Sequence, residues 1–323
     1  MTYMNYIDKN IKTIEENDTV GIIICKQDNS YVIKYCSDDR IIAREYELVW
    51  YNMNLCDIID IGCDTMALPK IMFKEMTLQE NIDVIKWAYF ENNGALSVHD
   101  FTIKYFPQLA NLDTNLSRDE IYKVIEEVVT NDYNKHKHRI KSETERYNTL
   151  WEQYNDSYFK ALSSYLKIEW PNNLKEISAT VGLIPVFPRY LDNFSFSIGT
   201  GVDDSKLLEV CAHETLHFLW FEKWKQIHPE TPRREYDSPY LVWQYSEMVT
   251  DPILNNKPFS TMFEFDERGY DSFYELEEDS SKVMDKLRNI YSKDISIEEK
   301  MNDGFNYINR VLNKDKDERI AKK

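Results

Sequence analysis

Residues 211–221 read CAHETLHFLWF and place His213, Glu214 and His217 in an H-E-x-x-H arrangement. On a helix, side chains four residues apart lie on one face, so both imidazoles can reach a single ion. Two neutral ring nitrogens can hold zinc with an open position for water, and a neighbouring carboxylate can take the proton of that water. The spacing therefore predicts a zinc site for hydrolysis, with Glu214 as the general base.

The predicted helix around this motif is apolar on nearly every side, which is typical of a buried helix. Its apolar residues are Leu207, Leu208, Val210, Cys211, Leu216, Phe218, Leu219, Trp220, Phe221 and Trp224. Two imidazoles and a carboxylate inside a core cost several kcal/mol unless they find partners. A zinc ion with its water would satisfy all three groups. The alternative is a pair of core histidines bonded to the backbone or to each other.

A third protein ligand is expected in the later stretch SPYLVWQYSEMVTDPIL, residues 238–254. Glu247 and Asp251 lie four apart there, among apolar side chains. Glu247 can ligate the metal, and Asp251 can accept the free N–H of a ligating histidine. Two further pairs share this spacing, Glu267/Asp271 and Glu275/Asp279. We favour Glu247 because the other pairs lie in a charged stretch that is expected to be solvated.

With the motifs HETLH and EMVTD, the sequence resembles the gluzincin metallopeptidases, the thermolysin-like branch of the zincins. The resemblance covers about residues 175–255. It implies that the zinc ligands are His213, His217 and Glu247. It also implies that Glu214 is the general base and that Asp251 is the partner of His213.

The strand that precedes the active-site helix in this family pairs with an extended substrate, and it corresponds here to NFSFSIGTG, residues 193–201. Phe194, Phe196 and Ile198 alternate with small residues in this segment, which predicts a half-buried strand.

A second group of zincins fits the sequence less well, and one functional role of the gluzincins is not assigned by it. Metzincins fit less well, because Trp220 and Lys223 stand where that group requires glycine and a third histidine. Gluzincins usually add a histidine or tyrosine that stabilises the oxyanion. The sequence leaves this role open among five residues, Tyr240, Tyr245, Tyr270, Tyr274 and His228.

The helices and strands expected around the candidate site residues indicate an α+β fold. Residues 1–110 are expected to form an N-terminal α/β region of unknown role, with strands at 19–25, 30–36 and 40–50 and a helix near 81–93. Residues 115–323 are expected to form a zincin-like catalytic domain. It would contain a small sheet, with strands near 176–186 and 193–201, the active-site helix and a helical C-terminal half.

Two helices are predicted at the start of that domain. A capping box formed by Ser117 and Glu120 opens the first. The second is predicted from about residue 143, where aromatic side chains recur every three or four residues as a packing surface. NKHKHRIK, residues 134–141, is expected to be a solvated basic turn between them, and not a metal site of His136 and His138.

The composition excludes several classes of partner. The chain has 39 Lys and Arg against 56 Asp and Glu, a formal charge of −17, which opposes binding to nucleic acid or to an anionic membrane. The five cysteines form no C-x-x-C pair and are expected to be reduced thiols. Without a signal peptide or a membrane-spanning segment in the sequence, we expect a cytoplasmic protein.

The leading hypothesis is a zinc-dependent metallohydrolase, most simply a peptidase that acts on a peptide or protein substrate. Two alternatives stay open. One is a zinc hydrolase with a different substrate, and the other is a non-catalytic, zinc-stabilised regulatory or protein-binding protein. A fourth protein ligand would favour the non-catalytic protein, whereas an open coordination position would favour the enzyme. No sequence feature selects a cleavage specificity or an oligomeric state.

Overall fold

The computed structural model describes residues 68–90, 98–113, 115–184, 186 and 188–321, together with two short strands near the N-terminus. The chain divides into two compact units, residues 1–65 and 66–323. In the first unit, β1 (Gly21–Cys25) pairs in parallel with β2 (Ile41–Glu45). These are two of the three predicted strands. The third, at 30–36, lies outside the described residues.

The second unit begins well before the domain boundary predicted near residue 110. Its first strand, β3 (Lys70–Glu75), pairs in parallel with β4 (Glu176–Gly182) and is therefore part of the central sheet. The helix predicted near 81–93 is confirmed as α3 (Leu78–Phe90), and it packs on α5. The boundary was misplaced because β3 joins a strand about a hundred residues further on, and such a pairing leaves no local signal in the sequence.

The sheet has four strands in the order β3-β4-β6-β5. β6 (Ser195–Gly199) runs parallel to β4, and the short β5 (Arg189–Tyr190) runs antiparallel to β6 at the edge. The strand predicted at 193–201 is confirmed as β6, but it is buried on both faces and not on one, since Ser197 is only 3% exposed although it alternates with buried Phe196. The hydroxyl groups of Ser197 and Thr180 lie 2.9 Å apart, so a hydrogen bond satisfies this buried side chain.

The two edges of this sheet differ. Along β3, two asparagine side chains occupy the outward backbone groups: Asn148 bonds both N–H and C=O of Phe73, and Asn155 bonds Ile71 N–H and Pro69 C=O. At the other edge, β5 covers only the beginning of β6. The first edge is therefore closed to a further strand, and the second borders the residues described below as the metal centre.

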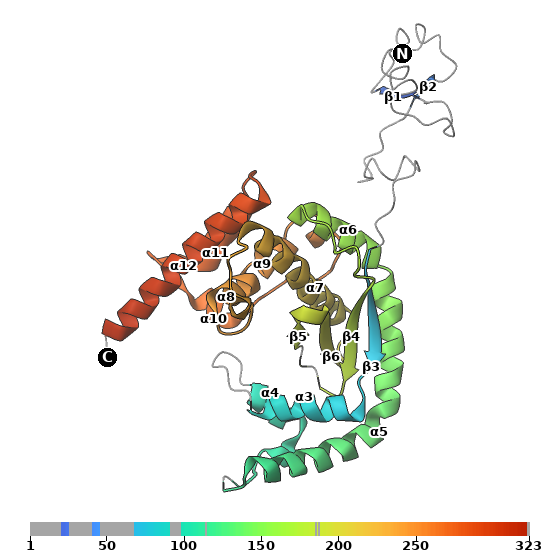
Figure 1. The fold of residues 1–323 in the computed structure, drawn as a ribbon, viewed down its shortest axis with the longest axis vertical. Coiled ribbons are helices and arrows are strands. Elements are labelled where there is room, and N and C mark those ends of the chain that lie inside the picture. The colour runs from blue at the N-terminus through green and yellow to red at the C-terminus, as the bar shows by residue number, and fades with distance from the viewer. Residues whose placement is uncertain are drawn as a thin grey trace. The chain divides into compact units, whose positions relative to one another are not determined.

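α5 (Arg118–Glu152) is one continuous helix of 35 residues that follows the β3 edge (Figure 1). The capping box of Ser117 and Glu120 is confirmed. The basic turn predicted at 134–141 is wrong, since this segment is helical and contains neither glycine nor proline to end a helix. The aromatic packing surface is confirmed, with Tyr147 and Trp151 on α5 and Tyr158 on α6 (Asn155–Leu166) all buried.

The remaining helices complete an α+β unit in which helix predominates. α7 lies between the sheet and the C-terminal helices (Figure 1). The helices are α4 (Val98–Tyr105), α7 (Asp204–Ile227), α8 (Leu241–Met248), α9 (Thr250–Leu254), α10 (Asp271–Glu275), α11 (Val283–Tyr291) and α12 (Ile297–Ala321). A two-residue hairpin, β7 (Glu277–Glu278) with β8 (Ser281–Lys282), joins α10 to α11.

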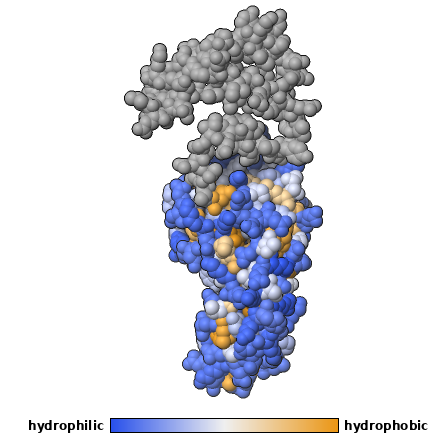
Figure 2. Space-filling model, turned by 90° about the vertical axis from the view of Figure 1, so that its right-hand side faces the viewer, coloured by the Kyte–Doolittle hydropathy of each residue, from blue (hydrophilic) through white to orange (hydrophobic). Residues whose placement is uncertain are grey.

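The surface agrees with the acidic, polar composition. On the face shown in Figure 2, hydrophilic residues predominate and apolar ones are scattered between them. None of the helices in the described part of the chain is long and apolar enough to cross a bilayer.

Candidate metal centre

α7 carries both histidines and fixes their spacing. The side chain of Asp203 caps the helix by accepting a hydrogen bond from Lys206 N, and the helix then continues to Ile227. One turn of this helix brings the Nε2 atoms of His213 and His217 to 3.0 Å from each other. The side chain of His217 is 1% exposed and that of His213 is 19% exposed, so the pair is reached from the His213 side.

Glu247, the penultimate residue of α8, brings its carboxylate to the same point. Its Oε2 lies 3.2 Å from His213 Nε2, and its Oε1 lies 3.4 Å from His217 Nε2. Ligands held at 2.0–2.1 Å around a tetrahedral ion are about 3.3 Å apart, and the three observed separations lie close to that value. Within the described part of the chain, this is the one group of histidine, cysteine or acidic side chains spaced to hold a metal ion.

The electrostatics of the three groups favour a cation among them. Burial lowers the pKa of His217 to about 3, so this imidazole is neutral. Burial alone would also lower the pKa of His213, but the carboxylates of Glu267, Glu247 and Glu214 raise it well above its ordinary value. Burial disfavours the charged form of Glu247, yet His217, His213 and Arg189 hold the pKa of Glu247 well below its usual range. A proton on His213 therefore occupies the place that a metal ion would take.

Glu267, and not Asp251, is the partner of His213. Its Oε1 lies 2.8 Å from His213 Nδ1, and its side chain is 1% exposed. The prediction that Asp251 takes this role is wrong. The charged stretch around Glu267 is largely exposed, as expected, but Glu267 itself is buried. The loop between α9 and α10 turns Glu267 inward, and this arrangement depends on tertiary contacts that the charged sequence does not reveal. A carboxylate at Nδ1 fixes the imidazole so that Nε2 presents its lone pair to a metal.

Asp251 instead belongs to a neighbouring cluster. Its carboxylate accepts hydrogen bonds from Tyr274 Oη at 2.7 Å and from Arg288 Nη2 at 2.7 Å and Nε at 3.1 Å. Asn255 connects this cluster to the metal centre, because it donates to Asp251 and forms two bonds with the backbone of Glu267. Asp251 thus helps to position Glu267 through Asn255, without contacting His213.

Arg189 is a site residue that the sequence did not reveal. From β5 it donates to Glu214 Oε2 at 3.1 Å through Nη1 and to Glu247 Oε1 at 3.2 Å through Nη2. Its side chain is 10% exposed. It stands 24 residues ahead of the first motif histidine, within FPRYLDN, where no spacing or pattern distinguishes it.

The predicted general base, Glu214, is buried beside the three metal-binding groups and is not one of them. Burial raises the pKa of its carboxyl group, while Arg189 and His213 act in the opposite direction without cancelling that effect. A carboxylate with a raised pKa next to a metal position is suited to accept and return a proton. The structure therefore brings together four of the five predicted site residues and leaves out only Asp251, the predicted partner of His213.

The charges and the donor atoms of the centre fit a divalent cation. When His213 is neutral, as a bound metal requires, the three buried carboxylates of Glu214, Glu247 and Glu267 leave two negative charges beyond the one positive charge of Arg189. A divalent ion would balance them. His217 Nδ1 and Glu267 Oε2 are buried without a hydrogen-bond partner among the described residues, but an ion held by His217 Nε2 and Glu247 would contact neither of them. Two imidazoles and a carboxylate are a donor set that suits zinc.

Three of the five oxyanion candidates have other partners. The hydroxyl of Tyr245 lies 2.8 Å from that of Tyr291, Tyr274 donates to Asp251, and His228 packs on Trp224. The fourth, Tyr240, is 40% exposed, and the guanidinium of Arg234 lies 5.9 Å from its ring. The fifth is Tyr270. Burial, followed by the carboxylates of Glu247 and Glu214, raises the pKa of Tyr270.

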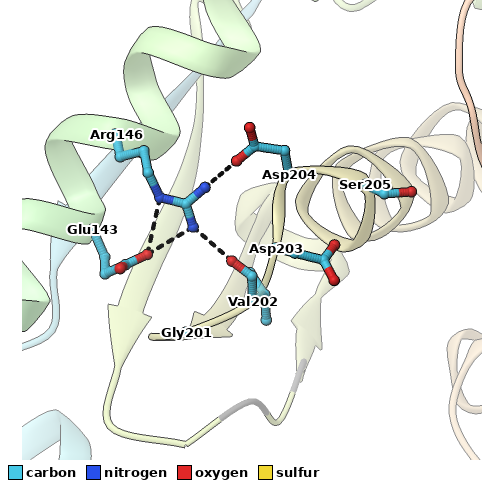
Figure 3. Close-up of a pocket in the computed structure, with 7 residues that line it drawn as sticks. All are labelled: Glu143, Arg146, Gly201, Val202, Asp203, Asp204 and Ser205. Atoms are coloured by element: carbon cyan, nitrogen blue, oxygen red, sulfur yellow. Dashed lines mark hydrogen bonds and ion pairs between the residues drawn. The ribbon is translucent and has the colours of Figure 1, made fainter.

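A surface pocket at the start of α7 is separate from this centre. Figure 3 shows Arg146 in this pocket, bonded to Glu143, to Asp204 and to the carbonyl of Val202. The pocket contains no histidine, and its one cation is already paired. His136 and His138 lie on the surface of α5 and do not join a metal-binding group.

Comparisons with known protein families, with curated proteins and with solved structures found no match to this chain.

Proposed function

We propose that the protein is a zinc-dependent hydrolase of the gluzincin type and that it cleaves peptide bonds. The proposal rests on one observation: His213, His217 and Glu247 converge with the spacing of a tetrahedral site, while Glu214 lies beside them, paired with Arg189 and outside the donor group. Zinc bound there would polarise a substrate carbonyl and supply a water molecule as the nucleophile. Glu214 would take the proton of this water and return it to the leaving amine.

Three protein donors, and not four, support an enzyme over the non-catalytic alternative. A structural zinc site is normally closed by four side chains, often with cysteine among them. Cys211 is buried on α7 but does not belong to the group of donors in the described part of the chain. The fourth position of the site would therefore be open to water and substrate.

The open edge of the sheet supports a peptide as the substrate. The segment predicted to pair with substrate, at 193–201, cannot do so along its first half, because β5 already pairs with it there. β5 itself is the edge strand. Since Ser197 N–H bonds Pro188 C=O, the antiparallel alternation turns the N–H and C=O of Arg189 away from β6. An extended peptide would bond these groups as an added strand, with its carbonyl groups near the metal centre.

The test compares wild-type protein with Glu214→Gln, using zinc titration and a mixed peptide library followed by mass spectrometry. The wild type is expected to bind one zinc and to cleave peptides. The variant is expected to bind zinc with similar affinity and to cleave about 10²–10⁴ times more slowly, because the base is lost while the ligands remain. Zinc binding without cleavage by the wild type would contradict a peptidase, and unchanged cleavage by the variant would contradict the assigned base.

A further inference from the structure

We propose that Arg189 is a catalytic residue that stabilises the oxyanion as it forms on the substrate carbonyl. The inference rests on the proposed function and assigns a role that the sequence left open among tyrosines and a histidine. It follows from the position of the guanidinium, which bridges the predicted base and a predicted metal ligand through separate nitrogens.

The geometry places Arg189 where the reacting carbonyl must come. Its two terminal nitrogens reach Glu214 at 3.1 Å and Glu247 at 3.2 Å, so the guanidinium borders both the position of the attacking water and the metal position. Its backbone belongs to the open edge strand, which we propose as the binding site of an extended peptide. One residue thus contributes an edge for the substrate and a cation next to its scissile bond.

No other cation is available for this role in the described part of the chain. Arg189 is the only lysine or arginine there that forms an ion pair with Glu214, Glu247 or Glu267. At 10% exposure, its charge is screened little by solvent, and this strengthens its interaction with a developing negative charge. The pKa of Tyr270 is raised by burial and by two of these carboxylates, but the structure gives its hydroxyl no hydrogen bond to them.

The proton balance shows how the negative charge next to Arg189 moves during the step. As water attacks, its oxygen bonds the carbonyl carbon, its proton passes to the Glu214 carboxylate, and the C=O electron pair moves to the carbonyl oxygen. Glu214 becomes neutral, and the oxygen becomes an anion. The negative charge paired with Nη1 of Arg189 has therefore moved from Glu214 to the substrate, and the guanidinium follows it. When the C–N bond breaks, the proton passes from Glu214 to the leaving amine and the original pair forms again.

The experiment measures zinc affinity and peptide cleavage separately for Arg189→Met and Arg189→Lys. Titration with zinc chloride should show that Arg189→Met binds zinc at least as tightly as the wild type, because a positive charge next to two carboxylates has been removed. Cleavage of the best library peptide should show kcat reduced about 10²–10³-fold with KM little changed, the loss typical of one oxyanion donor. Arg189→Lys, which keeps the charge, should lose less. These opposite shifts in affinity and turnover would not arise from general structural damage.

Arg233→Met is the matched control, because this arginine pairs with Asp192 and Asp237 away from the centre. It should change neither zinc affinity nor turnover. Three results would overturn the role of Arg189: turnover of Arg189→Met within threefold of the wild type, loss of zinc binding together with turnover, or a loss confined to peptides with acidic side chains. Wild-type protein that binds zinc but cleaves no peptide would contradict the proposed function itself, and the oxyanion role would fall with it.

Discussion

Two buried clusters of charge lie next to each other in the C-terminal half, and they differ in how completely they are satisfied. Around Asp251, one carboxylate meets one guanidinium, and both oxygens accept hydrogen bonds, from Tyr274, Asn255 and Arg288. Around His213, Arg189 pairs with Glu214 and Glu247, and the imidazole of His213 pairs with Glu267. Two buried polar atoms there have no partner among the described residues.

This difference separates a structural cluster from a functional one. A buried carboxylate that is fully hydrogen-bonded and balanced by a partly exposed guanidinium needs no further cation. A buried cluster with excess negative charge and convergent lone pairs is costly unless a cation completes it. Glu247 and Asp251, only four residues apart in one motif, fall into different clusters. The predictions below test whether the two clusters respond differently to the same kind of change.

Removal of a proposed ligand should have the largest effect. His217→Ala is expected to weaken zinc binding at least about a hundredfold, because one of three donors is lost. Isothermal titration with zinc checks this, and His228→Ala, a histidine outside the centre, is the control that should bind as the wild type does. Equal affinity in the two variants would show that the ion is held elsewhere.

Changing Glu267, the partner of His213, should have a smaller effect on zinc affinity. Glu267→Gln is expected to lower zinc affinity about 10–100-fold, because the imidazole loses the carboxylate that orients it. If Glu267→Gln left zinc affinity unchanged, the proposed difference between the cluster around His213 and the cluster around Asp251 would be contradicted.

The pH dependence of zinc binding should follow His213. Its pKa is raised in the metal-free protein, and zinc binds only the neutral imidazole, so binding must release a proton. Affinity should therefore fall as the pH is lowered, by up to about tenfold per unit below that pKa. Titrations in buffers with different ionisation enthalpies should reveal about one proton released at neutral pH. Affinity that is independent of pH, with no proton release, would contradict the raised pKa.

Asp251→Asn should have the smallest effect on zinc and act on stability instead. Loss of the charged partner of Arg288 is expected to reduce the free energy of unfolding by about 1–3 kcal/mol, at the lower end because Arg288 is 44% exposed. Urea denaturation measures this, while zinc affinity should stay within a few-fold of the wild type. A loss of zinc binding as large as that of Glu267→Gln would mean that the two clusters act as one.

The local part of the centre could be predicted from the sequence, and the long-range part could not. A helix fixes its own geometry, so the i, i+4 spacing correctly brought His213 and His217 together. Glu247 was also predicted correctly, because it lies in a segment whose other side chains are mostly apolar. Glu267 lies 54 residues from His213 in a charged stretch, and only the folded loop turns it inward. Arg189 reaches the centre through strand pairing at the sheet edge, which has no local pattern.

The same distinction applies to the fold. The helix opened by Ser117 and the strands β4 and β6 follow from local signals. β3 lies in the region predicted as N-terminal, where the sequence predicts no strand at 70–75, because its partner strand is about a hundred residues away. The continuous α5 shows the opposite error, since a run of basic residues looked like a turn although each of them tolerates a helix.

The central claim is that one divalent ion is held by the two histidines of α7 and by Glu247. Crystals of the wild-type protein grown with zinc, measured on both sides of the zinc absorption edge, test this directly. The account predicts one strong anomalous peak about 2 Å from His213 Nε2, His217 Nε2 and a carboxylate oxygen of Glu247, without a fourth protein ligand. The absence of a peak at this position, or a fourth side chain that closes the site, would contradict it.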